Sequence, residues 1–492
     1  MAQALRAELA RWEPVLRPLV EAFVSAGHSI YLVGGPVRDA LLGITASDLD
    51  FTTSARPDDI ETILRGLGGP IWDMGREFGT IGTILTFAHH DEAPGDAERQ
   101  WRVEVTTFRA DAYTANSRKP EVAFGDRIEE DLVRRDFTIN AMAVNLADRV
   151  FVDPYHGLVD LQAGVLRTPA TAQMSFSDDP LRMMRAARFV ARFGFRPTAE
   201  LVGAMMSLSD RLQIVSAERI RDEFTKLLMS DTPRVGVDLL VQTGLAQVFL
   251  PELPALRLEV DEHHHHKDVY DHSLTVLDQA ISLEKARHHD PDIVNRLAAL
   301  LHDIGKPRTR RYEAKGKVSF HNHDLVGARL ATKRLTALKY PKDIVTEVAR
   351  LIELHLRFHG YGEASWTDSA VRRYVRDAGG ELERLHILTR ADCTTRNKAK
   401  ADRLARNYEE LEWRIDELAT QEELESIRPD LDGNQIMEVL GIGPGRAVGQ
   451  AYAFLLDRRL ERGPVSVEAA TDELLAWWQA RQSEVGGDGG VG

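Results

Sequence analysis

The sequence predicts an α+β protein, in which a head with a mixed sheet and covering helices is followed by an all-α remainder. Runs rich in Thr, Val, Ile and aromatic residues, which are typical of strands, occur in the first 150 residues. After Asp178 the strand signal nearly disappears, and apolar residues recur at helical spacing. The length of 492 residues gives room for three or four domains.

Composition excludes several classes of protein. Hydrophobic residues make up 43% of the chain, which rules out global disorder. Cys393 is the single cysteine, which excludes an intramolecular disulfide and indicates a reducing compartment. No apolar run approaches the roughly 18 residues that span a bilayer, and the N-terminal segment mixes charges with short apolar steps, unlike a secretory signal. We therefore expect a cytoplasmic protein with no membrane partner.

The predicted elements of the head fall in residues 1–150. A helix is expected at Leu5–Ala26, and strands are expected at Ser29–Val33, Thr80–Phe87 and Trp101–Phe108. Two polar stretches, His89–Gln100 and Tyr113–Pro120, are expected to be loops.

The remainder is expected to divide into three helical parts: a neck at 151–255, a middle domain at 256–400 and a tail at 401–492. Predicted helices in the neck are Arg182–Phe193, Ala217–Met229 and Arg234–Phe249. Pro251 and Pro254 mark the boundary after the neck, and the tail helices are broken at Pro429–Gly433 and Gly441–Gly445.

The first cluster with chemical meaning is a glycine turn. A strand ends in Gly34-Gly35, and a helix is expected to start near Pro36. Two glycines let the backbone approach a ligand, the helix N-terminus offers free N–H groups to an anion, and Arg38 adds a cation one turn later. By themselves the glycines more often form only a tight turn, so a phosphate-binding role needs support from neighbouring residues.

A pair of carboxylates follows the expected helix. Asp48 and Asp50 are two residues apart, so in a strand they point to the same face. Such a pair repels unless a cation holds it, and oxygen ligands of this kind suit Mg²⁺ with substrate phosphates. A phosphate-binding turn before paired carboxylates indicates phosphoryl transfer, whereas an isolated pair of this kind is often a solvated turn.

These residues carry a family resemblance. The stretches GGPVRD and SDLDFTT closely resemble the signature of the DNA polymerase β nucleotidyltransferase superfamily, in particular its class II branch of CCA-adding tRNA nucleotidyltransferases and bacterial poly(A) polymerases. Further stretches resemble the later family motifs in family order: VEVTTFRAD (103–111), RRDFTINAMA (134–143), DPYHGLVDL (153–161), DDPLRMMRAARFVARFGF (178–195) and ERIRDEF (218–224). The resemblance implies a polymerase-β-like head and the addition of C, C and A to the 3′ end of tRNA from CTP and ATP, with release of pyrophosphate.

The resemblance also implies roles for individual residues. Asp48 and Asp50 would be the catalytic residues that hold Mg²⁺. The nucleotide would contact Gly34, Gly35, Arg38, Arg135, Asp136, Asn140, Asp179, Arg182, Arg185 and Arg188. Glu104 lies on the strand where distant superfamily members place a third carboxylate, and an ordinary glutamate on a strand face is an equally good interpretation.

Selection of C and A is expected from Asp179 and Arg182. At three residues apart on a predicted helix start, they share a face. An ionised Asp accepts hydrogen bonds and an Arg donates them, which matches the amine and ring nitrogen of cytosine or adenine and mismatches uracil and guanine. Without the surrounding motifs, an N-terminal cap with a salt bridge between the two side chains would be preferred.

The predicted helix Arg182–Phe193 carries an arginine stripe, which we define as Arg182, Arg185, Arg188, Arg192 and Arg196. No acidic residue interrupts it, and an apolar face lies opposite. A charged stripe usually faces solvent, but five arginines without a glutamate favour a path for triphosphate or RNA, because Arg binds phosphate well.

Two features favour CCA addition over the poly(A) alternative. The chain ends acidic to neutral, whereas poly(A) polymerases usually add a basic extension. The loop Asp111–Pro120 also resembles the flexible loop that CCA enzymes use to switch to A and that enzymes adding only CC lack. Poly(A) polymerase activity stays open as an alternative.

A second resemblance lies in the middle of the chain. His272, the dyad His302-Asp303 and Asp392 resemble the ligands of an HD phosphohydrolase domain, and His323 and His355 fall at positions used by two-metal members. Carboxylate and imidazole ligands suit Mn²⁺, Ni²⁺, Fe²⁺ or Mg²⁺. The run His263–His266 could add one further ligand, and whether the domain hydrolyses a substrate stays open. An alternative of a different class is a metal-dependent phosphohydrolase whose head only binds RNA.

The net charge of −14 argues at first against an RNA partner. Basic residues are nevertheless concentrated locally, in the arginine stripe and between Lys306 and Lys317, where a solvated loop is an equally good interpretation. The segment 431–456 resembles the tRNA-gripping tail of bacterial class II enzymes. We therefore expect tRNA as partner, bound along a confined basic track.

Overall fold

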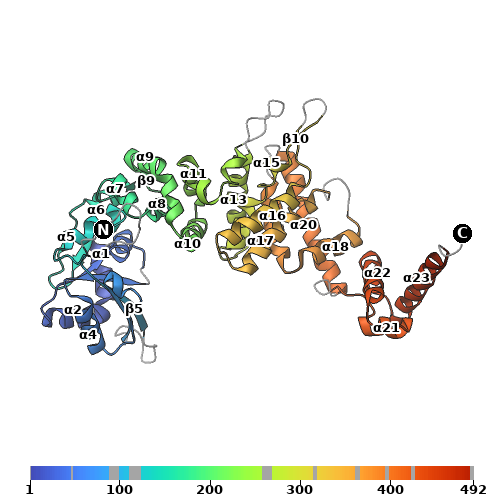
Figure 1. Cartoon of the computed structure of the whole chain (residues 1–492), viewed down its shortest axis with the longest axis horizontal. Helices are drawn as coiled ribbons and strands as arrows, with labels where there is room; N and C mark the ends of the chain where they lie inside the picture. Colours follow the sequence, from blue (N-terminus) through green and yellow to red (C-terminus); the bar gives the residue numbers. More distant parts are fainter. Residues whose placement is uncertain are drawn as a thin grey trace. The chain divides into compact units, whose positions relative to one another are not determined.

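The computed structural model describes residues 2–45, 48–87, 99–109, 123–257, 269–313, 318–360, 366–393, 398–422 and 427–487. These residues form two compact units, Met1–Pro251 and Glu252–Gly492. The first contains the sheet in blue and a helical continuation in green, and the second is built mainly of helices (Figure 1). The finer division into head, neck, middle and tail stays a prediction.

The first unit is organised around a seven-stranded mixed sheet with the order β3-β4-β5-β2-β1-β6-β7. Its strands are β1 (Ile30–Val33), β2 (Leu49–Thr53), β3 (Ile71–Trp72), β4 (Thr80–Phe87), β5 (Arg99–Thr107), β6 (Ala143–Asn145) and β7 (Phe151–Val152). At the centre, β2 runs parallel to β5 and antiparallel to β1. The α+β class and the predicted head strands are confirmed.

Helices of the first unit surround this sheet and continue beyond it. They are α1 (Ala2–Arg11), α2 (Glu13–Ser25), α3 (Gly35–Leu42), α4 (Pro57–Gly66), α5 (Ile128–Val133), α6 (Gly157–Ala163), α7 (Ala172–Asp178), α8 (Leu181–Phe193), α9 (Ala199–Leu208), α10 (Ala217–Leu228), α11 (Pro233–Gln242) and α12 (Leu245–Phe249). A two-stranded pair, β8 (Val165–Leu166) and β9 (Arg196–Pro197), lies between them in the chain.

Two helices that the periodicity predicted as continuous are broken. The predicted helix Leu5–Ala26 divides at Trp12, because Pro14 lacks an N–H and favours the first turn of a new helix. The predicted helix Arg234–Phe249 divides at Gly244, whose φ of 81° lies in the left-handed region that ends helices. Apolar spacing is continuous across both breaks, so periodicity alone could not detect them.

A small core holds the site motifs against the sheet. Val33 at the end of β1 packs with Phe108, with Ile128 and Leu132 of α5, and with Ala141 and Ala143 around β6. All six are buried. The chain segment that carries residues 134–140 is therefore fixed beside the glycine turn, although about 100 residues separate the two in sequence.

The second unit is mostly helical, as expected. Its helices are α13 (Val269–Ala286), α14 (Ile293–Leu301), α15 (Lys306–Thr309), α16 (His323–Ala337), α17 (Lys342–Leu354), α18 (Asp368–Ala378), α19 (Leu382–Asp392), α20 (Lys398–Gln421), α21 (Gly433–Leu440), α22 (Arg446–Arg462) and α23 (Val467–Gly487). A short hairpin of β10 (Arg311–Tyr312) and β11 (Val318–Ser319), which the sequence did not predict, interrupts them.

The last three helices have a core of their own. Ile436 of α21, Leu455 of α22 and Leu474 of α23 are buried together, and the rings of Phe454 and Trp477 stack at 5.0 Å. The predicted breaks between these helices are present, with Asp432 capping α21 and Gly441 ending it. None of the described helices is both long and apolar enough to cross a bilayer.

Candidate functional site

Three carboxylates share one face at the centre of the sheet. β2 and β5 run parallel with Asp50 directly opposite Glu104, so both side chains point to the same side. Asp48 lies two residues before Asp50, immediately before β2 begins. Glu104 therefore lies beside the predicted pair, and its carboxylate also accepts a hydrogen bond from Arg102 at 2.8 Å.

The electrostatics of this face fit a cation. Packing around Asp50 raises the pKa of its carboxyl, Glu104 and Asp48 raise it further, and Arg135 opposes the rise. The negative charges of Asp48, Asp50 and Glu104 therefore lie close together, and Arg135 compensates them only in part. Hard oxygen ligands in this arrangement suit a divalent cation such as Mg²⁺.

The glycine turn lies next to an anchored arginine. Gly34 has a φ of 76°, which disfavours any residue with a side chain, and a Cβ at this position would lie 3.0 Å from Nη1 of Arg135. Asp131 holds Arg135 through an ion pair of 3.0 Å and also binds Arg134. Burial alone would raise the pKa of Asp131, but the two arginines hold it below its ordinary value. Arg135 is thus presented, partly exposed, toward the turn.

A hydrogen-bonded chain joins the predicted nucleotide residues. Asn140 accepts from Arg38 at 2.6 Å and donates to Asp136 at 2.9 Å. Asp136 in turn accepts from Nε of Arg185 at 2.8 Å. Burial alone would raise the pKa of Asp136, but Arg185, Asn140 and Arg182 lower it to about 2. Four predicted residues that lie far apart in the sequence are thus brought into one network.

Arg38 is more buried than its predicted role suggests. Its side chain is 6% exposed, binds Asp39 at 2.7 Å, and lies over the rings of Phe189 and Phe193. In this structure it joins α3 to α8, and a contact with triphosphate stays a prediction. The sequence showed a cation at a helix start but not the two aromatic rings that cover it.

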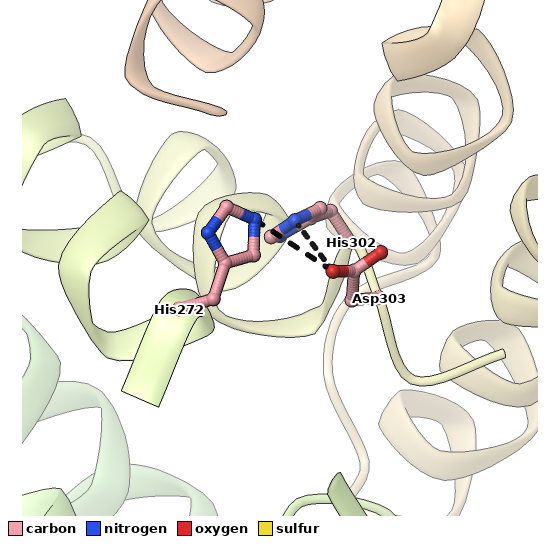
Figure 2. A group of neighbouring side chains, drawn as sticks. All are labelled: His272, His302 and Asp303. Carbon is pink, nitrogen blue, oxygen red and sulfur yellow. Dashed lines mark ion pairs between the residues drawn. The ribbon is translucent and has the colours of Figure 1, made fainter. Parts of the chain in front are cut away.

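The second unit brings all six predicted HD residues together. Nε2 of His272 lies 2.9 Å from Asp392 and 3.7 Å from Asp303, and Nε2 of His302 lies 3.3 Å from Asp303. Figure 2 shows the rings of His272 and His302 facing the Asp303 carboxylate. On the other side of Asp303, His323 lies 3.4 Å from Oδ1.

These contacts form two groups that share Asp303. His272 and His302 form one group with it, and His323 and His355 form the other; within each, the potential ligand atoms lie within 4.8 Å of one another. The ring centroid of His355 lies 5.3 Å from that of His302 and also 5.3 Å from that of His323. A carboxylate between two imidazole groups is an arrangement that can bridge two cations.

Backbone carbonyls orient the histidines. Nδ1 of His302, His323 and His355 lies 2.9, 2.8 and 2.6 Å from the carbonyl oxygens of Ala299, Phe320 and Ile352. Nδ1–H therefore donates to the backbone and Nε2 is turned toward the carboxylates, as in metal-binding histidines.

The charges inside the HD cluster suit a bound cation. Nε2 of His302 and Oδ1 of Asp303 are buried without a hydrogen-bond partner among the described residues. Burial alone would lower the pKa of His302, but Asp303 and Asp392 raise it to about 10, whereas burial lowers that of His355 to about 4. The carboxylates of Asp303 and Asp392 thus require a positive charge nearby. A divalent cation bound by neutral imidazoles would supply this charge.

Comparison with known families accounts for both sites. The poly A polymerase head domain model matches residues 30–167, the model described as probable RNA and SrmB-binding site of polymerase A matches 194–256, and the HD domain model matches 269–397. The A-adding tRNA nucleotidyltransferase of Deinococcus radiodurans is 32% identical over 434 residues, which cover 87% of this chain and 91% of that relative. The chain belongs to the tRNA nucleotidyltransferase family.

Other relatives in the tRNA nucleotidyltransferase family add different nucleotides. The CC-adding enzyme of Thermus thermophilus is 30% identical, with 92% of this chain and 95% of the relative covered. The multifunctional CCA protein of Pseudomonas paraeruginosa is 36% identical, with 67% and 75% covered. Among solved structures, the Bacillus stearothermophilus CCA-adding enzyme with CTP shares the fold with a TM-score of 0.66, at 23% identity over 96% of this chain and 99% of that one.

The structure places the two residues expected to select the base differently from the expected helical pair. Asp179 is not on the helix that carries Arg182: it has extended backbone angles, because Pro180 disfavours a helical conformation before it. Arg182 is 8% exposed and donates to Ser175 Oγ at 2.8 Å and to the Arg134 carbonyl at 2.6 Å. Asp179 instead lies 3.5 Å from Arg219 of α10. The expected shared helix face is therefore wrong for this state.

The arginine stripe has acidic partners from other elements. Arg185 binds Asp136, Arg188 binds Glu223 at 2.6 Å, and Arg192 lies 4.0 Å from Asp39. Arg188 and Glu223 are both largely buried, so this part of the stripe supports packing between α8 and α10. The absence of acids within the stripe was visible in the sequence, whereas the acids opposite it were not.

Several predictions fall outside the described residues. The loop Asp111–Pro120, the run His263–His266, and Lys315 and Lys317 of the basic stretch lie there. Residues that the sequence did not single out include Asp131 and Arg219. Asp131 could have been found from its spacing of four residues before Arg135, which suits an ion pair on a helix. Arg219 could not, since its contact spans 40 positions.

Replacing Asp136 with Asn is expected to remove about 2 kcal/mol of stability at neutral pH. The folded-state pKa of about 2 lies below the ordinary value of 3.8, so the carboxylate stabilises the fold above pH 4 and loses this effect as the pH falls through 2. Urea unfolding at pH 7 and at pH 3 should show the stability deficit of the variant falling to about half at the lower pH. The exposed pair of Asp126 with Arg56 gives the control: Asp126→Asn should cost less than about 1 kcal/mol. An equal deficit at both pH values would contradict the assignment.

Proposed function

We propose that the protein adds C, C and A to the 3′ end of tRNA, using CTP and ATP and releasing pyrophosphate. The observation that carries this proposal is the face on which Asp48, Asp50 and Glu104 converge, next to the Gly34 turn and Arg135. Membership of the family supports the same reaction. The acidic face and the basic turn lie side by side, as a reaction on a nucleoside triphosphate requires.

The roles of the residues follow from their positions. The 3′ oxygen of tRNA forms a bond to the α-phosphorus of the nucleotide, and the bond from that phosphorus to the oxygen bridging to the β-phosphate breaks. Mg²⁺ held by Asp48 and Asp50 would neutralise phosphate charge and favour the attacking hydroxyl. The N–H groups after Gly34 and the guanidinium of Arg135 are placed to bind the leaving pyrophosphate. Asp131 keeps Arg135 in that orientation.

The set of nucleotides added is part of the proposal. Relatives are named A-adding, CC-adding and CCA-adding, so family membership leaves the set open. The test uses three tRNA substrates, ending before CCA, after C and after CC, each with CTP alone, ATP alone or both. Full CCA addition requires incorporation on all three. Incorporation limited to C or to A would replace the proposal with a partial activity, and long runs of A without CTP would establish the poly(A) alternative.

Asp179 is proposed to read the base. Its carboxylate accepts a hydrogen bond from the Leu181 N–H at 3.1 Å, and its other oxygen lies 3.5 Å from Arg219. A carboxylate accepts from the amines of cytosine and adenine and repels the carbonyls of uracil and guanine. Arg182, the proposed second reading group, is bonded internally in this structure and would have to exchange those partners to reach a base.

Replacing Asp179 with Ala should reduce discrimination between CTP and UTP by roughly 10- to 100-fold, because one mismatched hydrogen bond costs about 1–3 kcal/mol. The measurement is kcat/KM for each of the four nucleoside triphosphates with tRNA ending before CCA. The neighbouring acid offers a matched control, since Asp178→Ala removes the same charge one position earlier. Equal loss of discrimination in both variants would remove the specific role of Asp179.

We also propose that the second unit is a divalent-metal-dependent phosphohydrolase. The convergence of His272, His302, Asp303, His323, His355 and Asp392 around buried polar atoms supports it. Their mixture of imidazole and carboxylate ligands suits Mn²⁺, Ni²⁺, Fe²⁺ or Mg²⁺. Lys306, whose Nζ lies 2.7 Å from Asp303, lines the same cavity and is placed to attract a phosphate. Neither the Lys306 contact nor the cavity was predicted.

The remaining parts of the proposal concern partner and location. Helices α21 to α23 pack together at the end of the second unit, and α21 and most of α22 fall in the segment 431–456 that resembles the tRNA-gripping tail. We propose that this part holds the upper half of tRNA, mostly through shape and backbone contacts. A cytoplasmic location follows from the tRNA substrate and the single cysteine.

A further inference from the structure

One row of paired residues crosses the sheet of the first unit on the face that carries the carboxylates. Asp50 of β2 lies opposite Glu104 of β5, which lies opposite Gly82 of β4. Gly82 in turn lies opposite Trp72 of β3. Residues that are paired directly across neighbouring strands project to the same face of a sheet. Trp72 therefore shares the face of the proposed Mg²⁺ site.

The indole ring of Trp72 covers Gly82. A Cβ built on Gly82 would lie 2.0 Å from Cε2 and 2.3 Å from Nε1 of Trp72, so the ring occupies the space into which a side chain would project. Glycine inside a strand costs roughly 0.5–1 kcal/mol relative to alanine, and here it lets the ring lie on the sheet beside Glu104. Strands lie about 4.8 Å apart, so two strand spacings, or roughly 10 Å, separate Gly82 from Asp50.

Arg102 extends this surface toward the carboxylates. It lies two residues before Glu104 on β5 and therefore projects to the same face. Its guanidinium carbon lies 5.4 Å from the centroid of the Trp72 ring, and its Nη2 lies 2.8 Å from Oε1 of Glu104. The Arg102 side chain is 59% exposed, and Trp72 is only partly buried. Aromatic rings and arginine planes that are open to solvent are the side-chain surfaces on which proteins stack nucleobases.

The ring and the glycine turn lie on opposite sides of the carboxylates. In the sheet, β1 is the neighbour of β2 on one side, and β5 is its neighbour on the other. Leu32 of β1 pairs with Phe51, so the turn that follows Val33 lies level with the start of β2. The leaving pyrophosphate is proposed to bind at that turn. Because phosphoryl transfer places the attacking and leaving oxygens in line, the attacking 3′ oxygen must approach from the β5 side, where Trp72 and Arg102 lie.

We propose that Trp72 and Arg102 form a stacking surface for the base of the 3′-terminal nucleotide of tRNA, whose hydroxyl attacks the incoming nucleotide. This inference rests on the proposed nucleotide addition. The attacking base changes during that reaction, from the nucleotide before CCA to the first C and then to the second. A stack accepts each of them, because every base has a π face, whereas hydrogen-bond recognition would have to change at each step.

The test uses tRNA ending before CCA, either unmodified or with an abasic 3′-terminal nucleotide that keeps its ribose and 3′-hydroxyl. With the parent protein, removal of the base should lower kcat/KM for addition of the first CMP roughly 5- to 100-fold, the range expected for loss of one base stack. Trp72→Ala should cause a similar loss on unmodified tRNA and little further loss on abasic tRNA, because both changes remove the same contact. Trp72→Phe should retain most of the activity, and KM for CTP should be unchanged in both variants.

The same strand supplies a matched control. Ile71 pairs with Thr83, one position before Trp72 along β3, so it projects to the opposite face of the sheet. Ile71→Ala should therefore leave kcat/KM for both tRNAs unchanged. Gly82→Ala tests the contact without removing the indole, since the added methyl group displaces the ring, and it should reproduce the loss on unmodified tRNA. An unchanged dependence of the rate on Mg²⁺ in each variant separates loss of the stack from damage to the carboxylates.

The outcomes separate this inference from the proposed function. Equal losses from Trp72→Ala on unmodified and abasic tRNA, or a loss from Ile71→Ala as large as that from Trp72→Ala, overturn the stacking surface. A rise in KM for CTP with normal use of tRNA also overturns it, because the ring would then contact the incoming nucleotide. None of these results affects the addition of CMP by the parent protein. Failure of the parent protein to add CMP to unmodified tRNA overturns the proposed CCA addition, and the stacking surface with it.

Discussion

Replacing Asp50 with Asn reduces nucleotide addition to tRNA by roughly 1,000-fold or more in kcat, with little change in stability. The expected size follows from the several kcal/mol that a bound metal contributes to the transition state, since each 1.4 kcal/mol is a factor of ten. Asn preserves the shape of the side chain and removes its charge. It therefore weakens the cation site on the face shared with Asp48 and Glu104 while relieving the repulsion that raises the pKa of Asp50.

The measurement is incorporation of labelled CMP into tRNA ending before CCA, with Mg²⁺ varied from limiting to saturating. Asp210→Asn, at an exposed acid of the same unit, is the matched control and should retain full activity. The converse result also decides between functions. If Asp50→Asn left incorporation intact, Asp50 would not hold the catalytic metal, and if the parent protein itself incorporated no CMP, the head would act only as an RNA-binding module, as the phosphohydrolase alternative requires.

Replacing Asp303 with Asn is expected to abolish the phosphohydrolase activity and to release the metal of the HD cluster. Asp303 is shared by both histidine groups, so its loss affects both at once. Loss of a partner that only orients a ligand already costs roughly 10- to 100-fold in metal affinity, and loss of a shared ligand should exceed this. Metal content after dialysis gives a readout that does not depend on knowing the substrate.

A neighbouring histidine supplies the control for this experiment. His321 lines the same cavity but is 70% exposed and pairs with Glu313, outside both ligand groups. His321→Gln should therefore retain the bound metal. Addition of CCA should be unchanged in both variants, since the two sites belong to different compact units. Retention of metal by Asp303→Asn would contradict the assignment of Asp303 as a shared ligand.

Local sequence patterns predicted several of the longer elements of the fold. The strand Thr80–Phe87 was predicted with the bounds that the structure has, and the helix expected from Arg182 starts one residue earlier. Alternation and helical spacing are set by near neighbours, so they are readable from one sequence. The breaks at Trp12 and Gly244 and the two-residue strands of the hairpin were missed, because single turn residues and very short strands leave no periodic signal.

For the functional sites, some predictions agree with the structure and others do not. The six HD residues were predicted from a resemblance to a known ligand order, and the structure brings all six together. The expected shared helix face of Asp179 and Arg182 was wrong, because Pro180 keeps Asp179 outside the helix. The arginine stripe was visible, but its burial against Asp136 and Glu223 was not.

By itself, the sequence determined the fold class, the order of motifs, the residue types at each site and hence the family. Only the tertiary structure decided which of these residues meet. Glu104 faces Asp50 because two parallel strands pair in one register, and a shift of one residue would have turned it to the opposite face. Asp392 reaches His272 across 120 positions through helix packing. Such contacts depend on how distant elements pack, whereas spacing in one sequence reports only on neighbours along the chain.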